Sequence, residues 1–594
     1  MTTLLAWSLH LHAPDTRIFT YNLLPETETF QWGIVEQSMC ISDVKQLLLA
    51  YNCRHRGTAT LILNLLHPSE PANSYDDGWQ AQYGDGTGNE LYVCSVPEVF
   101  IGWTFAQVSW FVFQEFQSIL IGVDIFLRPG TTGSSGDGPH FYHLSLNPGN
   151  SYRLGKFDQL VFIAQSPDDL EAIVSFKSDQ YERLLKDEKG HLEGSRSDFS
   201  EAMETYHPAA AAATANASKQ RHGATQTDNS SLGLDKSVAL VEQLAISTQG
   251  PIPKTDATES SDAIKENRDT HDPLQSLQLP GTSSTHGSLR GNSAQASLQP
   301  LDETTYIGQT SITRSETKDL PLCHLLISPP DSVKPLIRDD LSSFKNHIVV
   351  CANVGENLYR FLAILSFPRV FWVAGNCRHQ RDLVRAGILG ASSIVVMSHS
   401  VNGLDRDEFA DSTAIMAHHM VYQTLQQRNL LGRQHIVVEI LERSNIRFLN
   451  FLKGKGSSGL SVGPSGFWMT PIFASGQVLV TSLLDNVLFQ AYSKTHILDL
   501  VKLCCGVRFK QAIELDQILG IDCSNVCLIE TPPQFVGKSF LNLFQALSLK
   551  DGIIPLGLYR APDRELNNAL PFVFTNPLPG ILLKNTDMVY VLKS

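Results

Sequence analysis

The chain has 594 residues, of which 42% are hydrophobic and 18% charged, and its formal net charge at pH 7 is −14. This acidic balance argues against general nucleic-acid binding, which needs a basic face. Ten cysteines in so long a chain are too few for a disulfide scaffold and indicate a reducing compartment. No segment is apolar for long enough to predict a membrane span, so the chain as given is expected to be soluble and multi-domain.

Two blocks with the composition of folded domains, 1–186 and 321–594, flank a central segment that differs from both. The central residues 187–320 are rich in Ser and Thr and poor in aromatic residues. Such a composition cannot bury enough apolar surface to offset the entropy lost on ordering the chain. We therefore expect 187–320 to be a disordered linker.

Within the two blocks, short runs rich in β-branched residues alternate with segments of helical period. Examples are 158–164, 347–352, 393–398 and 435–441. This alternation predicts parallel α/β units, and the continuously apolar runs are typical of a sheet covered on both faces.

An internal repeat links the two blocks. FIGWTF at 100–105 matches FVGKSF at 535–540, and a second glycine follows twenty residues after each motif glycine, at Gly122 and Gly557. Asn147-Pro148 and Asn576-Pro577 each precede an aspartate by eleven residues, and an apolar strand follows each aspartate. The ordered set predicts one helix–strand–turn–strand unit used twice, with Asn-Pro fixing a tight turn.

The repeat extends towards the N-terminus of each block. TRIFTYNLLPE at 16–26 aligns with QHIVVEILERS at 434–444, but the second copy has about 65 further residues before this point. We therefore expect the chain to start in the middle of its first repeat.

Candidate chemistry is sparse. The run 351–359 lies where a dinucleotide-binding loop would be, but it holds a single glycine, so a Rossmann-like lobe without NAD is expected. Cys504, Cys505, Cys523 and Cys527 lack the usual zinc spacing and favour buried thiols. No Ser-His-Asp order, HExxH or CxxC occurs, so no enzyme is predicted.

Two acidic groups leave a cation site open. Asp405, Asp407 and Asp411 precede a predicted helix, where capping is the simpler role and cation binding the alternative. Glu90 closes a glycine-rich loop that also contains Asp76, Asp77 and Asp85, and this loop is either solvated or a source of oxygen ligands.

Several of these runs together resemble the cytosolic gating-ring region of Slowpoke-family potassium channels, which comprise calcium-activated (BK-type) and sodium-activated (Slack-type) branches. The matching segments in the first block are 51–66, 79–92 and 146–150. Those in the second are 344–352, 435–451, 473–492, 557–561 and 574–580. LCHLL at 322–326 points to the sodium-activated branch.

The resemblance implies tandem RCK domains, each with a Rossmann-like lobe and a smaller C-terminal α+β lobe. Residues 1–186 would be the C-terminal part of a first domain truncated at its N-terminus, and 321–470 and 471–594 the two lobes of the second. The sequence predicts that the second Rossmann-like lobe omits one strand–helix unit. Four chains would form a homotetramer, alone or with full-length channel subunits, at the cytosolic face of a membrane.

The implied ligand is intracellular calcium or sodium, which would couple to pore opening. Glu90 matches an acidic ligand of the first domain, whereas residues 450–469, where the family's calcium bowl falls, contain no carboxylate. Of the zinc cluster of the sodium-activated branch, Cys323 and His324 are kept. The alternative interpretation is a stand-alone Rossmann-like ligand-binding or scaffold protein without channel activity.

Overall fold

The computed structural model describes four main stretches of chain around the expected linker: 2–67, 78–127, 141–180 and 338–593. Shorter gaps within them leave out 23–25, 32–33, 178–179, 353–370, 399–410 and 450–465, besides single residues at 372, 374, 495 and 509. The predicted linker 187–320, Cys323 and His324 lie outside the described residues.

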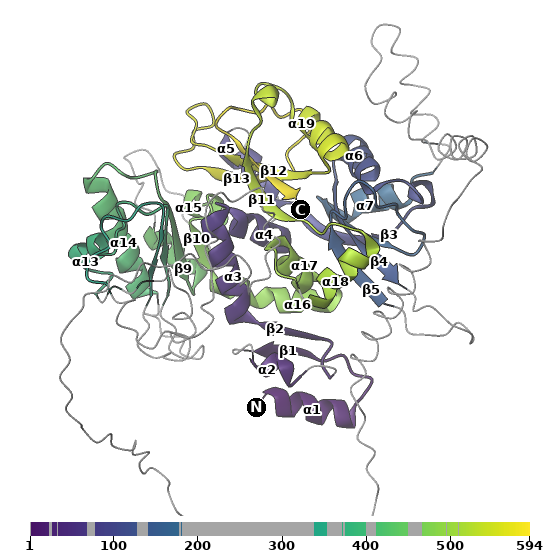
Figure 1. Ribbon diagram of the computed structural model, residues 1–594, viewed down its shortest axis with the longest axis horizontal. Coiled ribbons are helices and arrows are strands. Elements are labelled where there is room, and N and C mark those ends of the chain that lie inside the picture. The colour runs from purple at the N-terminus through teal and green to yellow at the C-terminus, as the bar shows by residue number, and fades with distance from the viewer. Residues whose placement is uncertain are drawn as a thin grey trace, which may run out of the picture.

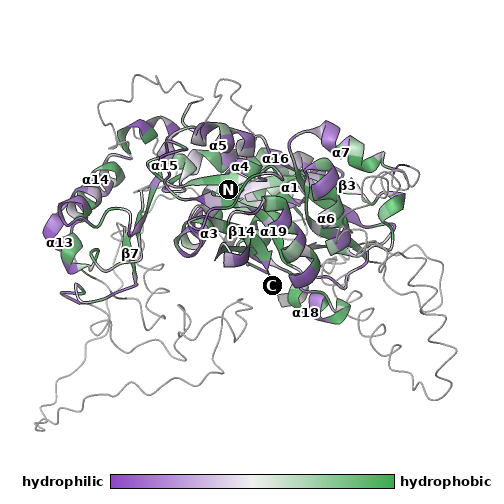
Figure 2. Ribbon diagram, turned by 90° about the horizontal axis from the view of Figure 1, so that it is seen from above, coloured by the Kyte–Doolittle hydropathy of each residue, from purple (hydrophilic) through white to green (hydrophobic). Residues whose placement is uncertain are grey.

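The first copy begins with a small parallel unit followed by three helices. Helix α1 (Thr2–His12) leads into strand β1 (Phe19–Asn22), which pairs in parallel with β2 (Gln37–Cys40), with α2 (Glu26–Thr29) between them. Helices α3 (Ile41–Arg54), α4 (Thr58–Leu66) and α5 (Trp79–Thr87) follow. All nine residues of α4 are buried, and this helix lies in the middle of the molecule (Figures 1 and 2).

An antiparallel four-stranded sheet completes the first copy. Its order is β3-β6-β4-β5. The strands are β3 (Glu90–Ser95), β4 (Ile119–Leu127), β5 (Phe141–Leu146) and β6 (Gln159–Ala164). Helix α6 (Phe105–Phe116) begins at a capping box in which Thr104 and Gln107 bond each other's backbone N–H. Helix α7 (Pro167–Val174) closes the copy and packs against α6 and β3.

The second copy starts with a parallel sheet of order β10-β9-β8-β7. Its strands are β7 (Ile348–Cys351), β8 (Ser393–Val396), β9 (His435–Ile440) and β10 (Val478–Val480), which confirms the parallel α/β prediction. Helices α13 (Gln380–Arg385) and α14 (Ser412–Gln427) belong to this lobe (Figure 1). Every residue of β8 and β9 is buried, as expected for strands covered on both faces.

Helix α15 (Pro471–Ala474) precedes β10, and helices α16 (Asp485–Ser493), α17 (Ile497–Cys504) and α18 (Lys510–Leu519) connect this lobe to a second antiparallel sheet. That sheet has the order β11-β14-β12-β13. It is built from β11 (Asn525–Glu530), β12 (Ile554–Arg560), β13 (Phe572–Thr575) and β14 (Met588–Lys593), with α19 (Phe540–Ala546) between β11 and β12.

The two antiparallel sheets repeat each other in detail, which confirms the predicted duplication. Each has a register shift in its third-listed strand, before Gly122 in β4 and before Gly557 in β12. A Cβ on these glycines would lie 2.8 Å from the Ser145 carbonyl oxygen and 2.5 Å from the Phe574 carbonyl oxygen. Glycine therefore occurs at both positions because neighbouring strands approach too closely there for a side chain.

The Asn-Pro turns also repeat. Asn147 and Asn576 both adopt positive φ, at 42° and 46°. Asparagine adopts this conformation more readily than most residues other than glycine, and the predicted tight turn is present in both copies.

The copies exchange helices. Helix α3 of the first copy packs on β8 and β9 of the second, and α16 of the second copy packs on β1 of the first. Phe113 of α6 stacks on Phe544 of α19 with ring centroids 4.2 Å apart. The buried apolar side chains of the two copies thus form one continuous core.

Candidate functional site at the seam between the copies

The contacts between the first copy (2–177) and the second (338–593) form a surface that we call the seam. Two asparagine side chains cross it reciprocally. Asn147 Nδ2 donates to the Gly552 carbonyl at 2.7 Å, and Asn576 Nδ2 donates to the Gln117 carbonyl at 2.9 Å. Gln117 and Gly552 both end a helix in the left-handed conformation, so the same contact is made twice. The seam is therefore a pseudo-twofold interface, like that of a symmetric dimer.

A second reciprocal pair lies where the exchanged helices begin. Lys45 Nζ lies 2.9 Å from Glu439 Oε1, and Tyr21 Oη donates to Asp485 Oδ1 at 3.1 Å. The strand pairs Asn22–Cys40 and Ile440–Val480 are equivalent. Counting forward from Cys40 and Val480 makes Lys45 equivalent to Asp485, and counting back from Asn22 and Ile440 makes Tyr21 equivalent to Glu439. The two copies therefore use the same positions with different chemistry.

Glu439 occupies the carboxyl edge of the parallel sheet, the edge at which open α/β sheets bind ligands. Its carboxylate is fully buried, accepts the Ser398 backbone N–H at 3.2 Å and is paired with Lys45. A lysine ammonium from the other copy thus balances a charge that would otherwise be buried alone.

Asp411, one of the predicted cation ligands, lies beside this edge. It precedes α14, and its carboxylate accepts the N–H groups of Leu441 at 2.7 Å and Glu442 at 3.0 Å, and Asn445 Nδ2 at 2.8 Å. It therefore ties the end of β9 to the start of α14. The predicted ligands Asp405 and Asp407 lie outside the described residues.

Glu90, the other predicted ligand, starts β3 in the first copy. Its carboxylate forms an ion pair with Lys494, which follows α16, and accepts Tyr92 Oη at 3.2 Å. The Lys494 ammonium also lies over the Tyr92 ring, 5.4 Å from its centroid. Glu90 lies in the antiparallel sheet of the first copy and Asp411 beside the parallel sheet of the second, so each would supply a separate site.

A second cation from the same loop meets an acid of the first copy. His496 Nε2 lies 3.1 Å from Oδ2 of Asp124, an aspartate in β4 that is 1% exposed. The hydrogen bond that His496 donates to Asp124 raises the pKa of His496, against the opposing effect of burial. Nearby, His143 Nε2 lies 2.6 Å from Asp516, which also pairs with Arg508 at 3.2 Å.

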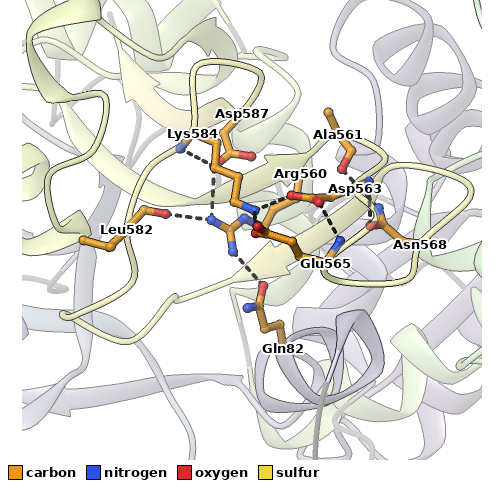
Figure 3. A network of polar contacts seen from close by, with 9 residues as sticks. All are labelled: Gln82, Arg560, Ala561, Asp563, Glu565, Asn568, Leu582, Lys584 and Asp587. Atoms are coloured by element: carbon orange, nitrogen blue, oxygen red, sulfur yellow. Dashed lines mark hydrogen bonds and ion pairs between the residues drawn. The ribbon is translucent and has the colours of Figure 1, made fainter.

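A network around Arg560, at the end of β12, joins the second sheet to the first copy (Figure 3). Arg560 donates to Gln82 of α5 at 2.8 Å, to the Leu582 carbonyl at 2.8 Å and to Asp587 at 3.2 Å. Lys584 extends the network through ion pairs with Asp563 and Glu565. A buried arginine with three partners fixes this corner of the sheet to α5.

Of the four cysteines predicted to be buried thiols, Cys504, Cys505 and Cys523 are buried, whereas Cys527 is half-buried. Burial raises the pKa of Cys504 to about 12, and burial also raises the pKa values of Cys505 and Cys523. Among the residues that the structure describes, no group of three or more His, Cys, Asp or Glu side chains is arranged to hold a metal ion.

Most of the residues that form the seam were not predicted from the sequence. Asp124 and Glu439 carry a visible signal, since each is an acid inside an otherwise apolar strand, ILIGVDIFL and HIVVEI. Lys45, Lys494 and His496 carry none, because their partners are far away in the sequence.

Two tandem copies of an α/β unit, joined by exchanged helices and a polar seam, define the class of protein: a duplicated α/β module. Two family models match the chain. The calcium-activated BK potassium channel alpha subunit model covers 36–123, and the slowpoke-like RCK domain model of calcium-activated potassium channels covers 333–449.

The chain is also similar in sequence to curated potassium channels. The chain is 23% identical over 621 residues to potassium channel subfamily T member 1 of Gallus gallus, covering 96% of this chain and 48% of the relative. It is 19% identical over 646 residues to the calcium-activated potassium channel slo-1 of Caenorhabditis elegans, covering 95% of this chain and 55% of the relative. The chain therefore spans about half the length of these relatives.

The solved gating ring of human SLO3 shares the fold. It matches with a TM-score of 0.59 and 18% identity, covering 99% of this chain and 83% of that one. In sequence and in fold the chain corresponds to the gating-ring region of Slowpoke-family channels, as the motifs predicted. No helix in the described part of the chain is long and apolar enough to cross a bilayer.

Proposed function

We propose that the chain is the cytosolic regulatory (gating-ring) portion of a cation-activated potassium channel and couples intracellular ion binding to pore opening. The observation that carries this proposal is the duplicated α/β unit with its reciprocal seam, found in a chain whose relatives are potassium channels. The relatives and family models concern channels and their regulatory domains, which favours this role over a stand-alone scaffold.

In this proposal, residues 1–186 are the C-terminal part of the first RCK domain and 187–320 are a linker. Residues 321–470 and 471–594 are the Rossmann-like and C-terminal lobes of the second. Four chains assemble into a homotetrameric ring at the cytosolic face of a membrane. A cation shifts the ring between two states only by its differential affinity for them. Four linked sites can together supply the roughly 5.5 kcal/mol that turns a mostly shut gate mostly open.

We propose Glu90 as a calcium or sodium ligand, with Asp405, Asp407 and Asp411 as a second candidate group. At Glu90 the cation competes with Lys494, whose ammonium occupies the same carboxylate. Removing Lys494 should therefore strengthen cation binding, whereas removing Glu90 should abolish it. At Asp411 a cation has to share oxygens that already accept backbone N–H groups.

The assembly is tested on the purified chain and the coupling on a chimaera. Mass photometry of the purified chain should give the mass of four 65.6 kDa chains. In the chimaera the chain replaces the gating ring of a sodium-activated channel, and inside-out patches are exposed to sodium or calcium. We expect one of the two cations to raise the open probability. A monomer at micromolar concentration together with a cation-insensitive chimaera would refute the proposed function.

The site is tested separately. Glu90→Gln should abolish the response to the cation and Lys494→Met should raise its apparent affinity about tenfold, as expected for loss of a tethered competitor. Glu98→Gln, an exposed glutamate of the same lobe, is the matched control and should behave like the parent. A chimaera that still responds when Glu90 is changed would remove Glu90 from the mechanism and leave the proposed function standing.

A further inference from the structure

The parallel sheets of the two copies differ at one edge. In the second copy β9 lies between β10 and β8, whereas the equivalent strand of the first copy, β1, pairs with β2 and with no other strand among the described residues. Every residue of β9 is buried, but Phe19 and Tyr21 of β1 are only half-buried. The edge of β1 that corresponds to the β8 side of β9 is therefore open.

Helix α16, which packs on β1, exposes apolar side chains. The equivalence of Lys45 and Asp485 makes Phe489 of α16 the counterpart of Leu49 of α3. Leu49 is 4% exposed, in a helix that packs on β8 and β9, whereas Phe489 is 76% exposed. Tyr492, one turn further along α16, is 62% exposed. The same helix position is thus covered beside the sheet that contains β8 and uncovered beside β1.

Helix α1 lies on the other face of the same strand. In Figure 1 β1 lies between α1 and α16, and both helices contact it. Only Ala6 of α1 is buried, and Trp7 Nε1 donates to the Phe30 carbonyl at 3.0 Å, which holds the helix in place. The large apolar side chains of α1 are all more than half exposed: Leu4, Leu5, Trp7, Leu9 and Leu11. An open strand edge is therefore flanked by exposed apolar side chains on both faces.

We propose that β1, α1 and α16 form a docking slot for a β-strand of another polypeptide, which pairs with β1 in parallel and carries apolar side chains on both faces. The second copy shows such a strand in place, since β8 pairs in parallel with β9 and is buried at every residue. Main-chain hydrogen bonds to the open edge supply the affinity, and the two helices bury the side chains of the docked strand.

The occupant is assigned to a different polypeptide because the fully buried strands of the parallel sheet that could fill such a slot, β8 and β9, already have neighbours on both edges. The inference rests on the duplication of the fold and not on the proposed channel role, so either can fail without the other.

The pairing in the second copy also gives the register and the chemistry of the docked strand. Val395 of β8 lies opposite Val437 of β9, and Val437 is the counterpart of Phe19. The docked strand therefore places an apolar residue opposite Phe19. Arg17, at the start of β1, is already paired with Glu36, and α1 contains no Asp, Glu, Lys or Arg. These flanks favour an uncharged strand.

The experiment tethers a strand of this type to the full-length chain. Residues 391–398, which contain β8, are duplicated ahead of Thr2 through a flexible Gly/Ser linker as long as residues 399–411, which brings the strand to an effective concentration of about 1 mM at the slot. Hydrogen exchange in the peptide that contains β1 should become at least about tenfold slower than in the parent, because its open N–H groups become bonded.

The matched control carries Ile394→Pro and Val396→Pro in the tethered strand only, because proline removes main-chain donors. This control should exchange like the parent. Leu9→Lys together with Phe489→Lys, on the two flanking helices, should restore fast exchange in the fusion, because charged side chains then meet the apolar strand. Phe157→Lys, at an exposed phenylalanine between β5 and β6, should leave the slow exchange unchanged.

A photoreactive benzoylphenylalanine in place of Phe489 locates the strand directly. It should cross-link to the tethered strand, whereas the same group in place of Phe157 should not. Exchange of β1 that is unchanged by the fusion, or equally slow with the proline control, would overturn the proposal. A cross-link from position 489 to a second copy of the unfused chain would also overturn it, because that copy would then be the occupant.

Discussion

The two antiparallel sheets share strand order, register shift and turns, yet they satisfy the same buried aspartate in different ways. In the first sheet Asp158 accepts neutral donors: the Gly155 N–H at 2.8 Å, Tyr152 Oη at 2.6 Å and the Phe126 N–H at 3.1 Å. In the second sheet Asp587 accepts the Lys584 N–H at 2.9 Å and pairs with Arg560 at 3.2 Å.

This difference shows which hydrogen-bond donors to the aspartate are common to both copies and which differ between them. The fold needs an acceptor at this aspartate to close the turn before the last strand, and a backbone N–H from the residue three positions earlier serves both copies. The remaining donors are not constrained by the fold. In the second copy they are charged and reach Gln82 of the first copy, so the same position also ties the copies together (Figure 3).

The largest expected effect comes from removing the Arg560 partner of Asp587 in the second sheet. Arg560→Met should lower the free energy of unfolding by about 4 kcal/mol, because it leaves the buried Asp587 carboxylate without its cation. In the first copy, Tyr152→Phe removes one neutral donor from Asp158 and should cost about 1 kcal/mol. Urea denaturation followed by tryptophan fluorescence measures both.

The double variant Arg560→Met with Asp587→Asn separates the ion pair from packing. It should recover part of the loss, because the uncompensated charge is gone. Equal losses for Arg560→Met and Tyr152→Phe would show that the two copies satisfy their aspartates at the same energetic cost, contrary to the comparison.

A smaller effect is expected from the reciprocal asparagines, where the copies are alike. Asn147→Gly and Asn576→Gly keep the positive φ of 42° and 46° accessible but remove the cross-seam hydrogen bonds, and each should cost about 1 kcal/mol. The alanine variants add backbone strain and should cost about 1 kcal/mol more. Hydrogen exchange should show faster opening at the helix ends at Gln117 and Gly552. A glycine variant as stable as the parent would mean that these bonds do not hold the seam.

Local geometry explains which features the sequence revealed. A close backbone approach or a positive φ restricts the residue type at a position, so these features can be recognised in the sequence. They are the FIGWTF and FVGKSF motifs, the paired Gly122 and Gly557, and the Asn-Pro turns. The ordered spacing of these features was enough to predict the duplication, and the alternation of β-rich runs with segments of helical period predicted the α/β class.

The seam was not predictable in the same way. Glu90 could be singled out as an acid, but its partner Lys494 is 404 residues away and follows a helix with no distinguishing pattern. Lys45 similarly looks like any surface lysine of an amphipathic helix until α3 is placed on β9. Long-range ion pairs place almost no restriction on the neighbouring sequence, so only the assembled fold reveals them.

The smallest expected effect tests the contact between His496 and Asp124. The folded-state pKa of His496 is raised above its ordinary value of 6.5 by Asp124, and Asp499 on the same helix acts in the same direction. The stabilisation is therefore fully present below pH 6.5 and is lost as the pH rises through the folded-state value. Because the imidazole is partly exposed, we expect the free energy of unfolding to change by less than about 1 kcal/mol.

Urea denaturation of the parent and of His496→Gln, compared between pH 6.5 and 8.5, isolates the contribution of His496. His418 and His435 do not contribute to it, because burial lowers their pKa values to about 4 and about 3. The stability of the parent relative to His496→Gln should fall with rising pH. A pH-independent difference would mean that His496 stays in one protonation state at the seam throughout this range.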